Sequence, residues 1–138
     1  MLINHTAHEP DNDKTIDAMV GEEYPIVDRI MMLGTGSEKM LITACSEFFK
    51  PALSKHQESN YGSIEIRTKG IIVHLNNGQW YHVWCIPFYR LAIYQTDSLS
   101  IHAEGKMIRF QLKKNQNKSF LQKLLTEKAK YSQDQYPF

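Results

Sequence analysis

Residues 99–110, LSIHAEGKMIRF, contain two short strands joined at Glu104-Gly105. One face of the resulting ribbon is apolar, and the other carries mostly polar side chains. A slip of one residue would exchange the two faces. The stretch therefore predicts an antiparallel β-hairpin in a single register, with the pairs Ala103–Lys106, Ile101–Ile108 and Leu99–Phe110.

A second hairpin is predicted around Asn77-Gly78. A two-residue turn with positive φ at both central positions favours this dipeptide. The flanking runs, residues 71–75 and 80–84, consist mostly of aliphatic and aromatic side chains. This register places His74 and His82 on opposite faces. Counting outward gives the pairs Leu75–Trp80, Val73–His82 and Ile71–Trp84.

Two further segments have the composition of strands. Residues 63–67 alternate apolar and polar side chains, and the turn after them offers Gly70 for a left-handed position. Residues 89–96 are rich in β-favouring side chains and follow Pro87, which suits a strand edge or corner. Together with the two hairpins, these segments predict six strands.

A C-terminal helix is predicted after the last strand. Ser119-x-x-Gln122 has the spacing of a capping box, which satisfies unpaired amides at a helix start. Apolar residues then recur at helical spacing and need a surface to bury them, which the sheet is predicted to provide. This stripe consists of Phe120, Leu121, Leu124, Leu125 and Tyr131.

Residues 25–33 predict a short helix, with Pro25 at its first position and Gly34 as a left-handed stop. Its apolar face consists of Ile26, Val27, Ile30 and Met31. The N-terminal residues 1–13 and the tail 133–138 are expected to be loosely ordered.

Residues 35–50 have two interpretations. In the first, Thr35 and Glu38 cap a second helix that ends before Pro51, and its inward side chains are Leu41, Ala44, Cys45 and Phe48. In the second, Met40–Cys45 is a seventh strand, because short apolar runs do not separate helix from strand by periodicity.

These segments predict an α+β fold. The expected architecture is an antiparallel β-barrel or strongly bent sheet of six to seven strands, closed by a C-terminal amphipathic helix, with short helices near the N-terminus. A chain of 138 residues with 42% hydrophobic residues is expected to form one domain. Cys45 and Cys85, without a basic-then-apolar leader, favour a reducing compartment. No apolar run approaches the ~18 residues of a membrane span, so a cytoplasmic protein is expected.

Charge is polarised along the chain. Residues 1–30 contain seven acidic and two basic side chains, whereas residues 106–130 contain eight basic side chains and one acidic. One account of this pattern is a solvated, lysine-rich helix. Its positive charge is partly offset by the acidic N-terminal segment, either within one subunit or between two. The alternative is a docking patch for an acidic partner or an anionic lipid headgroup. At about 1 kcal/mol per Lys, four lysines give roughly 4 kcal/mol, a millimolar attachment. The candidate residues are Lys113, Lys114, Lys118 and Lys123.

Four short stretches carry a resemblance to a known superfold. They are IRTKGIIV (66–73), IPFYRL (86–91), LSI (99–101) and IRF (108–110). Their order, with a final hairpin and then an amphipathic helix, resembles bacterial PH-domain and YcxB-like proteins over residues 62–131. The membrane hairpin of YcxB-like proteins has no counterpart here. The resemblance implies a PH-like fold that usually binds peptides, other subunits or lipid headgroups and is rarely catalytic. It assigns no site residues, because the family has no fixed site motif.

No motif for catalysis, a cofactor or a metal is present. The six histidines and two cysteines have no metal-ligand spacing, and no nucleophile elbow or phosphate-binding loop occurs. Among the aromatic residues of the predicted sheet, Tyr81 and Tyr89, with Arg90, suit protein contact or base stacking. Nucleic acid is not an expected partner, because the pI of about 7.8 lacks the usual basic footprint.

Two functional hypotheses follow. The first is a non-catalytic PH-like interaction module that binds a protein partner or itself through a sheet edge or the basic loop and helix. It predicts no cleft with converging polar groups and no cluster of titratable groups with shifted pKa values. The second is a small enzyme or metal-binding protein with a site around Cys45, Glu47 and His82, which predicts these side chains within hydrogen-bond reach of each other.

Overall fold

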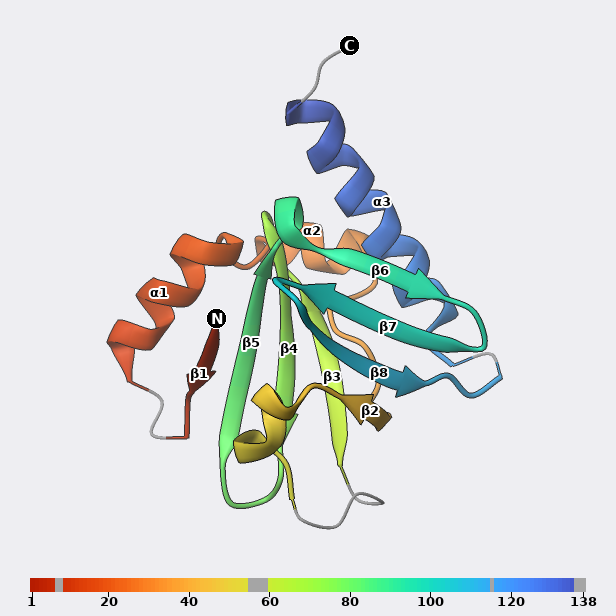
Figure 1. Cartoon of the computed structure of the whole chain (residues 1–138). Coiled ribbons are helices and arrows are strands. Elements are labelled where there is room, and N and C mark those ends of the chain that lie inside the picture. Colours follow the sequence, from red (N-terminus) through yellow and green to blue (C-terminus); the bar gives the residue numbers. More distant parts are fainter. Residues whose placement is uncertain (7–8, 55–59, 115, 136–138) are drawn as a thin grey trace.

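The computed structural model describes residues 1–6, 9–54, 60–114 and 116–135, with side chains as far as Ser132. Eight strands form one antiparallel sheet in the order β1-β5-β4-β3-β2-β8-β7-β6 (Figure 1). The strands are β1 (Leu2–Asn4), β2 (Met40–Cys45), β3 (Tyr61–Ile66), β4 (Gly70–Asn76), β5 (Tyr81–Pro87), β6 (Ala92–Gln95), β7 (Ser98–Ala103) and β8 (Lys106–Gln111).

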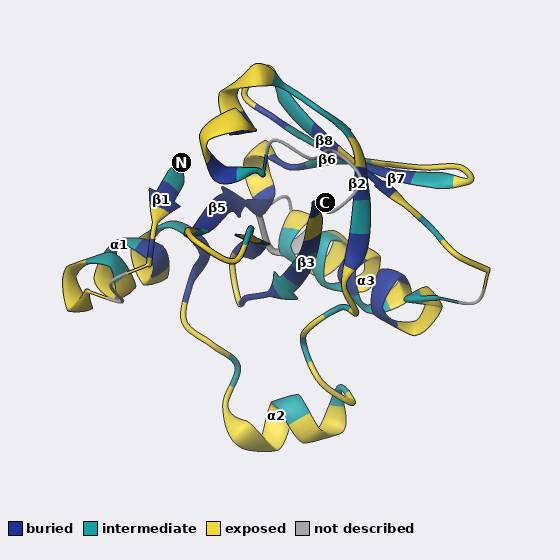
Figure 2. Cartoon of the chain, turned by 90° about the horizontal axis from the view of Figure 1, so that it is seen from below, coloured by how far each residue is buried: buried dark blue, intermediate teal, exposed yellow. Residues whose placement is uncertain are grey.

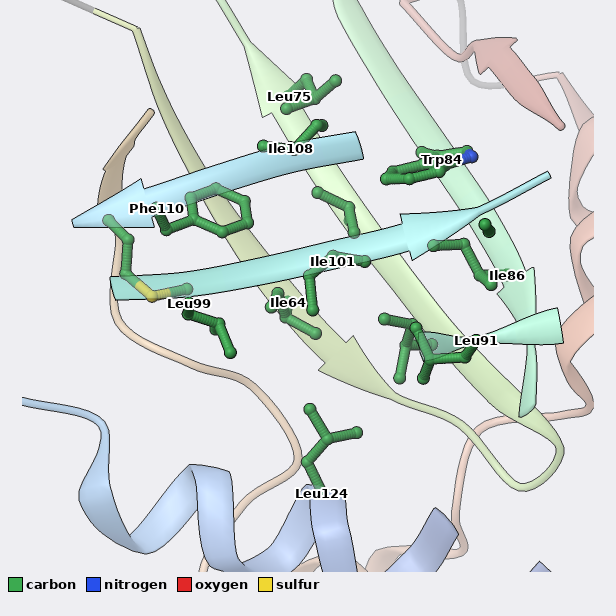
Figure 3. Close-up of a cluster of buried hydrophobic side chains, with 14 of the residues drawn as sticks. Ile64, Leu75, Trp84, Ile86, Leu91, Leu99, Ile101, Ile108, Phe110 and Leu124 are labelled. Carbon is green, nitrogen blue, oxygen red and sulfur yellow. The ribbon is translucent and has the colours of Figure 1, made fainter. Parts of the chain in front are cut away.

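The sheet bends strongly at β2, which pairs with β3 on one side and with β8 on the other. Strands β6–β8 run across β3–β5, and the main core lies between the two halves (Figures 1 and 3). The predicted α+β class and C-terminal helix are confirmed. The sheet is open, with β1 and β6 at its edges, and it has eight strands rather than six or seven.

The hairpin at Glu104-Gly105 has the predicted register. Both turn residues lie in the left-handed region, with φ of 53° and 78°. Its inward side chains are fully or almost fully buried: Leu99, Ile101, Ala103, Ile108 and Phe110.

The register predicted for the second hairpin is wrong by two residues. The Asn77 N–H donates to the Trp80 carbonyl at 3.2 Å, so the turn is centred on Gly78-Gln79. The Asn77 side chain accepts the N–H of Gln79 and of Trp80 at 2.9 and 2.7 Å, which holds Asn77 outside the turn centre. A shift of two keeps each side chain on its face, so the predicted core face survives. The pairs are Leu75–His82, Val73–Trp84 and Ile71–Ile86.

Gly70 is required for a different reason from the one predicted. It does not have positive φ but begins β4 opposite Pro87. A Cβ here would lie 2.3 Å from the Ile86 carbonyl oxygen and 2.9 Å from Pro87 Cα, so only glycine permits this close approach. Pro87 ends β5, and the predicted strand over residues 89–96 is shortened by the 3₁₀ turn η3 (Phe88–Arg90).

Residues 1–13, predicted to be loosely ordered, include a strand and the start of a helix, and residues 7–8 among them lie outside the described range. β1 pairs with β5, and α1 (Pro10–Val20) begins with its proline at the first turn. Ile16 and Val20 of this helix cover the outer face of the sheet, away from the main core. The buried residues of this second cluster are Ile3, Ile16, Val20, Ile72, Val83 and Cys85.

Of the two interpretations of residues 35–50, the strand is correct. β2 is extended because its backbone pairs with both β3 and β8. It is followed by the 3₁₀ helix η1 (Glu47–Ala52), which buries Phe49 edge-on against Trp84 with ring centroids 4.6 Å apart. Phe48, predicted inward, is exposed beneath the Lys106 ammonium.

α3 (Lys118–Gln135) closes the open side of the bent sheet. It begins one residue before Ser119, so the predicted capping box is not its start. Leu124 points into the core towards Leu91 and Ile64 (Figure 3). Leu124 is fully buried, whereas Leu125 is 47% exposed. The helix includes residues 133–135 of the predicted loose tail, and residues 136–138 lie outside the described range. No helix in the described residues is long and apolar enough to cross a membrane.

Candidate functional site

A short helix, α2 (Ile26–Met31), stands away from the body of the molecule (Figure 2). None of its residues is buried, although four of the six are apolar. Ile26, Val27, Ile30 and Met31 are 66%, 70%, 67% and 79% exposed, and Leu33 after the helix is 85% exposed. The face predicted from the sequence therefore exists, but within the described chain it packs against nothing. We call residues 21–39 the α2 arm.

The local sequence explains the limits of this helix. Pro25 precedes it in an extended conformation, and two left-handed residues end it, Leu33 with φ of 60° and Gly34 with φ of 94°. The Gly34 N–H donates to the Arg29 carbonyl at 2.8 Å and the Leu33 N–H to the Ile30 carbonyl at 3.1 Å. This is the Schellman pattern of a helix end. Gly34 takes the left-handed conformation predicted for it.

Arg67 anchors the N-terminal end of the α2 arm. Its guanidinium, almost fully buried, donates to Asp17 Oδ1 at 3.0 Å and to the Gly21 carbonyl at 3.3 Å. It also lies 3.6 Å from Glu23 Oε1 and donates to Glu65 Oε2 at 2.5 Å. Burial opposes the charge on Arg67, but the bonds to Glu65 and Asp17 outweigh it and hold the pKa above its usual value. One buried cation thus joins α1, the α2 arm and β3.

The C-terminal end of the α2 arm is fixed by backbone hydrogen bonds to β3. The Ile66 N–H donates to the Thr35 carbonyl and the Ser37 N–H to the Ile64 carbonyl, both at 2.8 Å. Lys123 of α3 donates to the carbonyls of Leu33 and Gly34 at 3.4 and 3.1 Å. Both ends are therefore firmly held while the helix between them remains exposed.

A polar network continues from Arg67 across the outer face of the sheet. His74 Nε2 lies 2.9 Å from Glu65 Oε1, and His74 Nδ1 lies 2.5 Å from the Tyr81 hydroxyl. Burial favours protonated Glu65, but hydrogen bonds from His74 and Arg67 outweigh it and lower the Glu65 pKa. An ionised Glu65 accepts the Nε2–H, and in this tautomer Nδ1 accepts a hydrogen bond from the Tyr81 hydroxyl.

The Tyr81 hydroxyl is not activated by this network. Burial, and after it the Glu65 carboxylate, raise the pKa of Tyr81 to about 12. The phenol therefore remains protonated near neutral pH, and the geometry suits a structural or ligand-contacting group better than a base. A cavity of about 280 Å³ lies between this network and the α2 arm, with Arg29, Thr35, Glu65 and His74 among its lining residues. The interaction-module hypothesis predicted neither such a polar cavity nor a cluster of shifted pKa values, and both of these predictions are wrong, because the arm brings its polar side chains to the outer face of β3.

The four predicted lysines do not form one patch. Lys113 and Lys118 line a groove of about 320 Å³, which we call the α3 groove. Lys114 is exposed beside it, and Lys123 is committed to the carbonyls at the end of α2. The residues lining the α3 groove are Gln95, Leu112, Lys113, Gln116, Lys118, Leu121, Gln122 and Leu125.

The predicted aromatic contact residues also lie apart. Tyr81 begins β5, and Tyr89 follows its end, about 20 Å away for seven extended residues. Tyr89 is exposed under the Arg90 guanidinium, 5.3 Å from the ring centroid, and Arg90 forms an ion pair with Glu104. Tyr81 and Tyr89 therefore cannot contact one small ligand together.

No hydrogen bond joins Cys45, Glu47 and His82, all of which the structure describes. Glu47 pairs with Lys50 at 3.1 Å, and His82 is buried with its Nδ1 unpartnered. Cys45 lines a separate cavity of about 490 Å³. Burial raises its pKa, an effect that Lys50 only partly offsets, and burial raises the pKa of Cys85 to about 11. Neither thiol is activated.

The described residues contain no group of three or more metal-binding side chains. His74 and His82 point to opposite faces of the sheet, as predicted. His5, which follows β1, is buried beside β5, with its ring centroid 5.8 Å from that of Tyr81. His8 and His56 lie outside the described residues.

Two parts of this region were missed from the sequence. Glu65 of β3 and Arg67, directly after this strand, are two residues apart, so their shared polar face is visible in the alternation of residues 63–67, but their partner Asp17 is not. The exposure of α2 has a weak signal in its shortness, its wide apolar arc and the proline and glycine that flank it. A comparison with protein-family models, curated proteins and solved structures finds no match for this chain.

Proposed function

We propose that this chain is a non-catalytic interaction module of the PH-like kind that self-associates through α2. Support for the PH-like part comes from strand order: β2 to β5 form one meander and β6 to β8 a second, β2 pairs with β8 to join the two, and an amphipathic helix comes next. The observation that carries the interaction role is the apolar face of α2, held off the body by the α2 arm.

An exposed apolar face of this kind is costly unless a partner covers it. Contiguous apolar patches on soluble proteins commonly mark interaction sites. The conformation of Leu33 costs free energy for two reasons: its aliphatic side chain is exposed to water, and its backbone adopts a left-handed φ of 60°. Such strain persists where the surrounding structure imposes it, and it is concentrated at functional sites. The α2 arm fits the mode in which a short amphipathic helix inserts into a groove.

A second copy of the chain is the partner that charge favours. The acidic end of the sequence contains the α2 arm, and the basic end contains β8 and α3. Opposite charges on different surfaces of one chain attract two copies in a defined orientation. In this interaction the chain binds a second copy of itself, and the basic loop and helix of that copy provide the contact surface.

The affinity is expected to be modest. Fully burying an aliphatic side chain contributes about 1.5–3 kcal/mol, so five partly exposed ones contribute roughly 5–10 kcal/mol. Association costs about 4–15 kcal/mol in lost freedom. The α2 face alone therefore gives weak, reversible association, in the micromolar range or weaker.

The titratable groups support binding over catalysis. Glu65 and Arg67 are each held more firmly in their charged forms, and Tyr81 in its neutral form. A general acid or base instead has a pKa near the working pH. The network is better suited to fixing the α2 arm than to proton transfer.

Sedimentation velocity across the micromolar to millimolar range tests this proposal. The wild type is expected to associate reversibly, whereas a chain with Val27→Asp and Ile30→Asp remains monomeric, because two carboxylates cannot be buried unpaired. Tyr89→Asp is the matched control, since Tyr89 is equally exposed but lies outside the arm. Both variants should keep the wild-type melting temperature.

Two results would contradict the proposal. One is a wild type that stays monomeric at millimolar concentration. The other is binding of the wild type, but not of the α2 variant, to vesicles containing phosphatidylserine, which would assign α2 to a membrane surface instead.

A further inference from the structure

We infer that α2 of one copy inserts into the α3 groove of a second copy. This inference rests on the proposed self-association and names the surface that receives the helix. The contact is heterologous, because the inserting surface and the receiving surface are different parts of the chain.

The α3 groove has the composition that α2 requires. Leu112, Leu121 and Leu125 supply apolar surface, and Leu125 is 47% exposed although Leu124 beside it is fully buried. The groove is built from two parts of the chain: the end of β6, and the connection after β8 together with the first two turns of α3 that follow it directly. Its volume of about 320 Å³ accommodates a few aliphatic side chains rather than a whole helix. The apolar edge of α2 is therefore the part that enters it.

The charges around the α3 groove and on the α2 arm are opposite in sign, and several of them have no ion-pair partner among the described residues. Lys113 and Lys118 are exposed at the groove, and no described carboxylate lies within ion-pair distance of either. On the α2 arm, Glu22 and Asp28 are exposed and likewise have no ion-pair partner among the described residues. Docking α2 with its apolar edge in the groove brings these opposite charges to the rim of the contact, where they set its orientation.

α2 does not enter the α3 groove of its own chain. Lys118, Gln122 and Leu125 form one stripe of α3, whereas Lys123 and Glu127 form a stripe almost opposite. Lys123 holds the carbonyls of Leu33 and Gly34, and Glu127 accepts the Tyr24 hydroxyl at 3.1 Å. The C-terminal end of α2 is thus attached to a flank of α3 that lies away from the groove, whereas Lys39, the last residue of the α2 arm, accepts a hydrogen bond from the groove residue Gln116 at 3.2 Å. An α2 helix that enters this groove is therefore expected to come from a second copy of the chain.

Site-directed cross-linking tests the contact. In a Cys45→Ser background, one chain carries Ile30→Cys and a second, larger tagged chain carries Leu125→Cys. A mixture at an associating concentration is expected to form a disulfide-linked heterodimer under mild oxidation, and each chain alone forms little homodimer. Cys85 is buried and stays in all chains.

A charge exchange provides a second readout that does not alter the apolar contact. Lys113→Glu with Lys118→Glu is expected to weaken self-association by about three- to tenfold, as for two rim ion pairs. Mixing this chain with an Asp28→Lys chain should restore association. Lys114→Glu is the matched control, because Lys114 is exposed next to the groove but does not line it.

The outcomes separate the two proposals. Homodimers of the Ile30→Cys chain that form as readily as the heterodimer would show that two α2 helices pack on each other, which overturns the groove and leaves self-association standing. Charge variants that behave like Lys114→Glu would overturn it as well. A wild type that does not associate at any concentration tested would contradict both proposals.

Discussion

Among the described residues of the sheet, His82 has a buried side-chain nitrogen without a hydrogen-bond partner. It lies on the face that carries Leu75 and Trp84, is 9% exposed, and its Nδ1 has no hydrogen-bond partner. A buried polar atom without a partner costs about 1–3 kcal/mol. Replacement by an apolar side chain of similar size is therefore expected to be tolerated or stabilising.

This residue predicts a pH dependence of stability. Burial lowers the pKa of His82 below its ordinary value of 6.5, so the unfolded chain binds the proton more tightly than the folded one. Its contribution is fully present above about pH 6.5 and is lost as the pH falls below it, by up to about 1.4 kcal/mol per pH unit. His82→Leu should flatten the fall in unfolding free energy between pH 7 and pH 5.

Urea denaturation of the wild type and His82→Leu at several pH values measures this difference. Parallel pH profiles for the two proteins would count against it. The low pKa of Glu65 acts in a lower window, since its stabilisation is lost only as the pH falls below the ordinary 4.5 of a glutamic acid.

Among the elements, α3 shows how one helix divides its apolar stripe between two uses. Phe120, Leu121 and Leu124 are buried in the main core, and Tyr131 lies 5.6 Å from the Phe88 ring. Leu125 belongs to the same predicted stripe, yet it faces the α3 groove. Helical spacing alone does not distinguish the core residue Leu124 from the groove residue Leu125, because the two side chains lie on one broad apolar arc.

The two leucines therefore predict a contrast in stability. Leu124→Ala is expected to lower the unfolding free energy by about 2–5 kcal/mol, because it leaves a cavity in the core. Leu125→Ala should cost less than about 1 kcal/mol in dilute protein, because half of this side chain is already in water. Chemical denaturation at low concentration checks both, and equal losses would contradict the structure.

α2 is an element that could not persist by itself. A helix of six residues is far shorter than the ~12 residues at which isolated helices become marginal in water. Its conformation depends on its ends, where the arm is bonded to Arg67, β3 and Lys123. These anchors explain how an apolar helix is presented without being buried.

At the scale of the whole molecule, the sheet and the helices packed on it form the body, and α2 stands exposed beside this body. Hydrogen exchange should show this division. At low concentration the amides of α2, such as that of Arg29, should exchange at least about tenfold faster than the anchoring amides of Ser37, Ile66 and Lys69.

The same measurement at an associating concentration is expected to slow exchange in α2. The surface turn η3, where the Leu91 N–H donates to the Phe88 carbonyl, is the internal control and should not change. Protection that spreads equally over both segments would indicate general aggregation rather than docking of α2.

Local chemistry explains what could be predicted from sequence. Glu104-Gly105 specifies a turn, and the two-residue period around it specifies which side chains face inward, so the hairpin register follows. Asn77-Gly78 specifies a turn too, but the Asn77 side chain bonds to two amides and shifts its centre by one residue. The helical spacing of Phe120, Leu121 and Leu124 likewise needs no distant partner to be recognised.

Only the tertiary structure decided the remainder, because it depends on partners far along the chain. β2 is a strand since β3 and β8 offer it hydrogen bonds, and β1 and α1 are ordered since β4 and β5 provide a surface for them. Arg67 acquires its role from Asp17, fifty residues away. The exposure of α2 follows from the same cause: the core is filled by other residues, and the anchors of the arm hold this apolar helix away from it.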